Sequence, residues 1–197
     1  MNPEKSSRPS IKENLYNWAF FLVEAFAAME VTAVIVANAR ITESLGLREE
    51  LSSLIINSYL YPLFAAMIAL LLASRWVRRH IAPTPLFLAG LGLFACGNVI
   101  CALAHIPVLF FFGRLVMGLG GALSFAGQLW TLSSYYRRHI EVSLVWGEAG
   151  TALGVVAGPL VGAFFVQLSP GGWRDFFWLN GGMGLMTACF AYIALKG

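Results

Sequence analysis

Residues 142–167 read VSLVWGEAGTALGVVAGPLVGAFFVQ, a run of apolar and small residues that carries one charged side chain, Glu148. A helix needs roughly 20 mostly apolar residues to cross a bilayer, so this run is long enough for one span. Prolines, glycines and clustered charges separate it from similar runs elsewhere in the chain. These runs are 16–38, 53–74, 85–104, 107–132 and 176–195. We therefore expect an all-α polytopic membrane protein with six transmembrane helices.

The composition argues against a soluble protein. Of the 197 residues, 58% are apolar and 12% are charged, whereas soluble domains average about half apolar and a quarter charged. The net charge of +3 is too small to indicate a nucleic-acid partner. The sequence lacks the Gly-x-Ser-x-Gly, HExxH and P-loop motifs, and its histidines are far apart in expected loops. We expect no enzyme, no metal site, no bound cofactor and no nucleic-acid partner.

The charges between the runs indicate how the chain crosses the membrane. Three cations lie on one side of it: Arg40, Arg48 and Arg174. Nine lie on the other side: Lys5, Arg8, Lys12, Arg75, Arg78, Arg79, Arg137, Arg138 and Lys196. Because cytoplasmic loops carry the excess of lysine and arginine, both termini are expected in the cytoplasm. Residues 1–15 would then form a cytoplasmic head, and residues 16–197 the membrane domain.

Four ionisable residues lie inside the apolar runs: Glu24, Glu30, Arg114 and Glu148. Each costs roughly 2.5–3.5 kcal/mol at mid-span in lipid, so we expect all four to face protein or water. Glu30, nearest the midplane, is predicted to be a proton or cationic-substrate site, the alternative being a buried partner of a neighbouring helix. Arg114 cannot lose its charge, and Glu30 is its expected partner. Gly118 follows one turn later on nearly the same face, which permits the close approach of a neighbouring helix. Glu24 points about 120° away from Glu30 on a helix and is either structural or part of the site.

Glycines recur through residues 142–167 at spacings of three or four: Gly147, Gly150, Gly154, Gly158 and Gly162. They form a flat stripe on one helix face, against which another helix can pack backbone to backbone. Pro159 lies within the stripe, removes one helical hydrogen-bond donor and is expected to kink the helix.

With these motifs the chain resembles the amino-terminal six-helix half of a major facilitator superfamily transporter, and is most similar to the EmrB/QacA-type multidrug/proton antiporters. The spacing from Gly150 to Gly162 resembles the antiporter signature of the fifth span. The motif Arg114-xxx-Gly118-x-Gly120 resembles that of the fourth span, with Met117 in place of the usual glutamine. Residues 173–180, WRDFFWLN, are similar to the loop into the sixth span. The resemblance implies 3+3 inverted repeats and a location in the plasma (inner) membrane.

Two motifs depart from the pattern of this family. Glu30 stands where the first span usually has aspartate. Residues 70–79, LLLASRWVRR, keep Arg75, Arg78 and Arg79 of the loop after the second span but lack its glycines and aspartate. In the family this loop gates the cytoplasmic side, so the resemblance implies a gating role for the three arginines.

The resemblance also implies a function, secondary active transport. We expect proton-coupled efflux of a small amphipathic or cationic compound, with the proton gradient as the driving force. Four aromatic residues are expected to line its apolar cavity: Tyr59, Tyr61, Phe64 and Phe125. The alternative is a non-transporting membrane subunit or scaffold that keeps the fold for interaction only.

Transporters of this family hold the substrate between two six-helix halves, and six runs provide one half. The chain is therefore expected to pair with a copy of itself, to receive its second half from another chain, or to be a shortened copy of a longer transporter. Four polar residues would face the second half: Glu30, Arg114, Asn98 and Gln128. An isolated half would expose them to lipid, which favours pairing.

Overall fold

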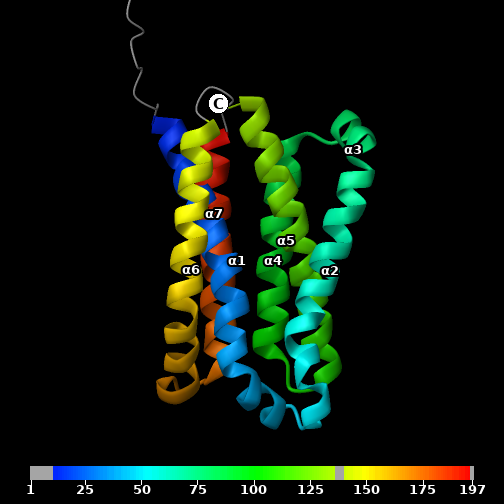
Figure 1. Cartoon of the computed structure of the whole chain (residues 1–197), viewed down its shortest axis with the longest axis vertical. Helices are drawn as coiled ribbons and strands as arrows, with labels where there is room; N and C mark the ends of the chain where they lie inside the picture. Colours follow the sequence, from blue (N-terminus) through cyan, green and yellow to red (C-terminus); the bar gives the residue numbers. More distant parts are fainter. Residues whose placement is uncertain (1–10, 136–139, 196–197) are drawn as a thin grey trace, which may run out of the picture.

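Six long helices run through the part of the chain that the computed structural model describes, residues 11–135 and 140–195 (Figure 1). They are α1 (Ile11–Ser44), α2 (Ser52–Leu72), α4 (Pro83–Leu103), α5 (Pro107–Tyr135), α6 (Ile140–Leu168) and α7 (Trp173–Leu195). Two short helices lie in the connections, η1 (Glu49–Leu51) and α3 (Ser74–His80). All six long helices have the length and apolar composition of membrane spans, which confirms the predicted fold class.

The first helix is longer than the apolar run that predicted it. Within the described residues it starts at Ile11, five residues before the expected run, and residues 11–15 contain no proline or glycine that would stop a helix. It continues to Ser44, past the expected end at residue 38, and an ion pair of 3.1 Å joins Arg40 and Glu43 in its last turns. Residues 1–10 of the expected head lie outside the described residues, as do Arg137, Arg138 and Lys196.

The connection after α2, expected to be a loop, is instead the seven-residue helix α3. Leu70, Ser74 and Val77 occupy the positions at which the resemblance implies glycine or aspartate, and all three are compatible with helix. Basic residues in its last turn, Arg78, Arg79 and His80, also stabilise the negative end of the helix dipole. The three arginines predicted to gate the chain therefore lie on a short helix and not in an irregular loop.

The helices form two groups of three, with α1, α6 and α7 side by side in one and α2, α4 and α5 in the other (Figure 1). Extensive contacts join α1 to α6 and α4 to α5, and α7 packs against both α1 and α4. The packing of the first three spans is repeated by the last three. The contact of α1 with α6 corresponds to the contact of α5 with α2, and the contact of α4 with α5 corresponds to the contact of α7 with α1. An odd number of spans in each unit inverts the second unit, so this pattern agrees with 3+3 inverted repeats.

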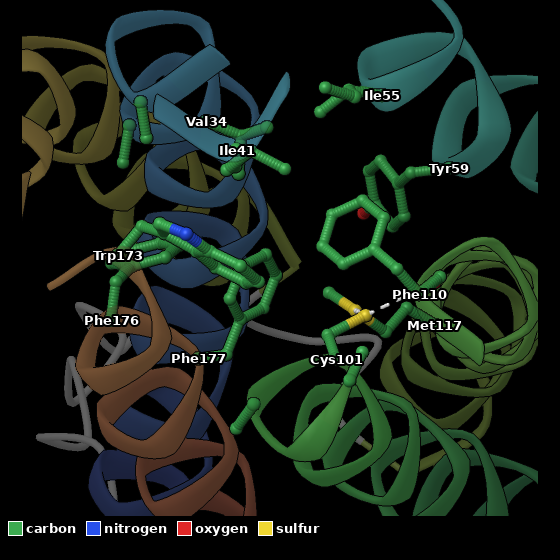
Figure 2. Packing of buried hydrophobic residues seen from close by; sticks show 14 of the residues in the cluster. Val34, Ile41, Ile55, Tyr59, Cys101, Phe110, Met117, Trp173, Phe176 and Phe177 are labelled. Carbon is green, nitrogen blue, oxygen red and sulfur yellow. Dashed lines mark hydrogen bonds between the residues drawn. The ribbon is translucent and has the colours of Figure 1, made fainter. Parts of the chain in front are cut away.

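A cluster of buried aromatic and aliphatic side chains joins five of the helices at the end away from α3 (Figure 2). Phe110 of α5 packs edge-on against Phe177 of α7, with ring centres 5.8 Å apart. Beside them, the thiol of Cys101 lies 3.6 Å from the carbonyl oxygen of Phe110. This cluster holds α7 against α5. It also provides apolar surroundings for the polar site described below.

The glycine stripe of α6 packs against α1. A methyl group added at Gly150 or Gly154 would overlap the carbonyl oxygens of Phe21 or Ala25, and one at Gly162 would come within 2.6 Å of the carbonyl oxygen of Ala33. The helix runs without interruption through Pro159. The two backbones therefore lie in direct contact, as small-residue stripes allow in membranes.

A second set of glycines, of which the sequence analysis named only Gly120, makes the corresponding contact between α4 and α5. A methyl group at Gly97 would lie 2.7 Å from the carbonyl oxygen of Gly113, and one at Gly120 would lie 2.8 Å from that of Gly90. Gly113, Gly120 and Gly127 are seven residues apart, so the signal was present as a seven-residue repeat.

Candidate functional site

The centre of the bundle holds an ion pair between Glu30 of α1 and Arg114 of α5, both with fully buried side chains. Asn180 of α7 donates a hydrogen bond of 2.7 Å to the second carboxylate oxygen of Glu30. Arg114 Nε donates to the carbonyl oxygen of Ile55 at 3.1 Å, and its guanidinium carbon lies 4.9 Å from the ring centre of Tyr59. One charge pair therefore joins α1, α2, α5 and α7.

These contacts offset the cost of burying two charges. Moving a carboxylate or a guanidinium from water into the protein interior costs roughly several kcal/mol of free energy for each ion, even after the structure relaxes. Glu30 recovers part of this through partners on both oxygens. Within the described ranges, Arg114 Nη2 and Asn180 Oδ1 have no hydrogen-bond partner. A donor and an acceptor are thus available beside the carboxylate.

Glycine at position 118 makes the approach of α2 possible. A methyl group there would lie 2.5 Å from the carbonyl oxygen of Tyr59. Since Gly118 is one turn from Arg114, it lets α2 come close enough to place Ile55 and Tyr59 on the guanidinium. This is the close approach that the Arg114-xxx-Gly118 spacing predicted.

Glu24 lies two turns before Glu30 on α1 and has a different environment, as their angular separation predicted. Its side chain is half-buried, accepts a hydrogen bond of 2.8 Å from Gln128 of α5 and lies 3.5 Å from the hydroxyl of Thr151 of α6. It lines an apolar cavity of about 210 Å³. The cavity is enclosed chiefly by Val23, Phe26, Tyr59, Leu63, Met67, Leu91, Phe94 and Phe125.

Glu148 is exposed on α6 and does not contact Arg114. With Glu24 and Thr151 it lines a smaller pocket of about 100 Å³. Of the four intramembrane charges, the structure thus joins Glu30 to Arg114 and brings Glu24 near Glu148, in two separate places.

The aromatic residues expected in the cavity divide between three locations. Tyr59 and Phe125 line the cavity beside Glu24, while Phe64 lines a groove between α2 and α5. Tyr61 is 65% exposed and lies on the outer face of α2. Because Tyr59 and Tyr61 are two residues apart, a helix directs them to different faces, and only one of them can point inward.

The four polar residues expected to face a second half are instead buried within this one. Glu30, Arg114, Asn98 and Gln128 all have no exposed surface in the isolated bundle. Asn98 donates to the carbonyl oxygen of Phe94 at 2.9 Å, and Gln128 to Glu24. The expectation that an isolated half would expose them to lipid is wrong, because helices of the same half supply their partners.

Three residues of the motif at 173–180 make contacts that hold the start of α7 in place. Trp173 donates to Ser44 Oγ at 2.9 Å, Arg174 donates to the carbonyl oxygen of Ala104 at 2.9 Å, and Asn180 contacts Glu30. The sequence analysis quoted this motif but assigned no role to Asn180. A polar residue about one turn inside an apolar run was the available signal.

Comparison with known proteins places these features in a family. The model of the Major Facilitator Superfamily matches residues 20–196. The chain is 27% identical over 173 residues to the methylenomycin A resistance protein of Bacillus subtilis, covering 86% of this chain and 36% of the relative. The protein of the same name from Streptomyces coelicolor is 34% identical over 175 residues, covering 85% of this chain and 35% of the relative. Efflux pump mlcE of Penicillium citrinum is 33% identical over 103 residues, 52% of this chain and 18% of the pump.

The chain thus spans about a third of the length of the two resistance proteins. The match to the family model extends over all six spans, beginning inside α1 and continuing past the end of α7. Together with the six-helix bundle, it shows that the chain is an integral membrane protein of a transporter family and not an enzyme, and that it belongs to the major facilitator superfamily.

Proposed function

We propose that the chain forms half of a secondary active transporter that exports a small amphipathic or cationic compound in exchange for protons. One observation carries the proposal: the charged pair of Glu30 and Arg114 lies in the same half as an apolar cavity with a second carboxylate, Glu24, in its wall. The names of the relatives, two resistance proteins and an efflux pump, agree with export.

In this proposal Glu30 carries the proton. Arg114 makes the arrangement of the helices depend on whether Glu30 is charged. Protonation of Glu30 would leave the guanidinium buried without a counter-charge, which is a costly state. The bundle would relieve this cost by shifting α1 relative to α5 and α7, which hold the pair. Release of the proton on the other side of the membrane would restore the ion pair.

Glu24 is proposed to meet the substrate. Its carboxylate lies at the edge of the apolar cavity, so an aromatic cation could place its ring among Phe94 and Phe125 and its charge beside Glu24. Glu148 and Thr151, which share the adjoining pocket, would extend this acidic region. A cavity of about 210 Å³ in one half accommodates only part of a drug-sized molecule.

The other part of the site is proposed to come from a second six-helix half, either a second copy or a separate chain. Exposed apolar side chains, among them Val156 and Leu160, lie on α6, the helix on which Glu148 is exposed. The assembly is proposed to lie in the plasma (inner) membrane. Both termini would lie in the cytoplasm, because nine of the lysines and arginines outside the spans are on the side of the termini.

Cysteine crosslinking in native membranes tests for the second half. In a chain with Cys96, Cys101 and Cys189 replaced by alanine, Val156→Cys and Leu160→Cys are expected to crosslink to a partner. A cysteine at Leu185, exposed on the outer face of α7, is the matched control and should remain uncrosslinked. Crosslinks that are absent at residues 156 and 160, or equally strong at residue 185, would contradict the pairing.

Flux through proteoliposomes that contain the chain with its second half tests the transport function. Glu30→Gln is expected to abolish export driven by a pH gradient while substrate exchange continues, because glutamine cannot release a proton. Glu24→Gln should reduce transport of cationic compounds at least about tenfold, a loss of one charged contact of about 1.4 kcal/mol, and spare neutral ones. Glu49→Gln is the control, because the carboxylate of Glu49 is exposed and lies in η1, away from the cavity.

Loss of exchange together with gradient-driven export in Glu30→Gln would indicate misfolding, and Glu30→Asp then decides the matter. It retains an ionisable carboxyl and is expected to keep coupling, whereas complete loss would refute the proton role. If the native assembly shows no flux of any compound, the second candidate, a non-transporting subunit or scaffold, is favoured. The replacement of the gating aspartate by Ser74 is the observation on its side.

A further inference from the structure

The three arginines of α3 share one exposed helix face. Arg75, Arg78 and Arg79 have the spacing i, i+3 and i+4, which brings their side chains together on a helix. All three are exposed, and within residues 11–135 and 140–195 none forms an ion pair with a carboxylate. Three like charges at this spacing repel one another unless an anion lies between them.

Aromatic rings surround this cationic face. The indole of Trp76, 61% exposed, stacks on His80 with ring centres 4.6 Å apart. The guanidinium of Arg78 lies 5.8 Å from the ring centre of Trp130 on α5. Exposed indoles beside cations are typical of the depth at which lipid headgroups meet the hydrocarbon layer.

An apolar groove of about 340 Å³ leads from this face along α2 and α5. Its lining includes Phe64, Met67, Ile68, Leu71 and Trp130, and Ser74 provides the one hydroxyl among the described lining residues. Ser74 begins α3, and Trp130 is the ring beneath Arg78, so the groove reaches the arginines at one end. Among the described residues, no carboxylate lines the groove.

We propose that this groove and the arginine face of α3 bind one anionic phospholipid from the leaflet at that end of the bundle. An acyl chain would lie in the apolar groove, and the phosphate would accept hydrogen bonds from Arg75, Arg78 and Arg79. Arginine suits this role because its guanidinium can donate two parallel hydrogen bonds to a phosphate. Serine at position 74 is favourable here, since a carboxylate at the mouth of the groove would repel the phosphate.

Native mass spectrometry of the full-length chain, released from micelles containing equal amounts of dioleoylphosphatidylglycerol and dioleoylphosphatidylcholine, tests the proposal. The wild-type chain is expected to retain the anionic lipid preferentially. Each arginine replaced by glutamine should weaken that retention about fivefold, the effect of one cation near an anionic lipid surface. Retention of phosphatidylcholine should not change.

Arg40→Gln with Arg48→Gln is the charge control and should leave retention unchanged, because these arginines lie near the end of α1 and before η1, and α1 ends at the opposite end of the bundle from α3 (Figure 1). Ala126→Phe tests the groove independently, because it fills the groove without altering charge, and it should reduce retention of the anionic lipid. Ala69→Phe, exposed on α2 outside the groove, is its control. Equal retention of the two lipids, or equal losses in the control variants, would overturn the proposal. So would a dimer that excludes the lipid and dissociates with Ala126→Phe, because the groove would then belong to a second copy.

Discussion

Glu30→Met is expected to destabilise the bundle by about 3–5 kcal/mol, the usual cost of removing one partner of a buried ion pair. Arg114 cannot shed its charge, so the variant would leave a guanidinium with no exposed surface and no counter-charge. Its contacts with the carbonyl oxygen of Ile55 and the ring of Tyr59 solvate it only in part. Titration with sodium dodecyl sulfate in mixed micelles, followed by tryptophan fluorescence, measures the free energy of unfolding.

Arg114→Met should cost less, because the carboxyl group of Glu30 can bind a proton and become neutral. The double variant Glu30→Met with Arg114→Met should recover most of the loss, since apolar side chains of similar size often replace a buried pair without penalty. Glu49→Met, at an exposed site outside the pair, is the control. Additive losses in the double variant would show that the two charges do not stabilise each other.

Gly154→Ala is expected to destabilise the bundle by about 1–3 kcal/mol, the cost of overpacking a close contact. The new methyl group would overlap the carbonyl oxygen of Ala25, which is backbone and cannot move aside without displacing α1. Unfolding in the same mixed micelles measures the effect. Transport should fall as well, because α1 carries both Glu24 and Glu30.

Gly92→Ala is the matched control, because a methyl group there meets no other atom within 4 Å. Alanine is favoured over glycine inside helices by up to about 1 kcal/mol, so this variant should be neutral or slightly more stable. The two substitutions are chemically identical, but only the methyl group at residue 154 meets the backbone of another helix. The change in unfolding free energy should therefore be a loss at residue 154 and not at residue 92. Equal effects at both positions would mean that the stripe does not set the approach of α1 and α6.

Much of the site could be read before the structure was known. A charged residue in an apolar run is costly in lipid, which singled out Glu30 and Arg114 and led to their predicted pairing. The spacing of Gly118 from Arg114 predicted the close approach of a neighbouring helix. Asn180 was assigned no role and Gln128 was wrongly expected to face a second half, since an amide within a span shows no preference for one partner until the helices are placed.

The amino-acid sequence by itself determined the six spans, their order and the identity of the charged pair, because continuous apolar runs and isolated charges have one inexpensive arrangement in a bilayer. Only the tertiary structure decided which residues are enclosed. Arg114, Asn98 and Gln128 are buried by helices of their own half, while Glu24 opens onto a cavity and Glu148 onto the surface. Burial depends on which faces of distant helices meet, and those faces are set by backbone contacts at Gly90, Gly154 and their neighbours, which periodicity alone cannot pair.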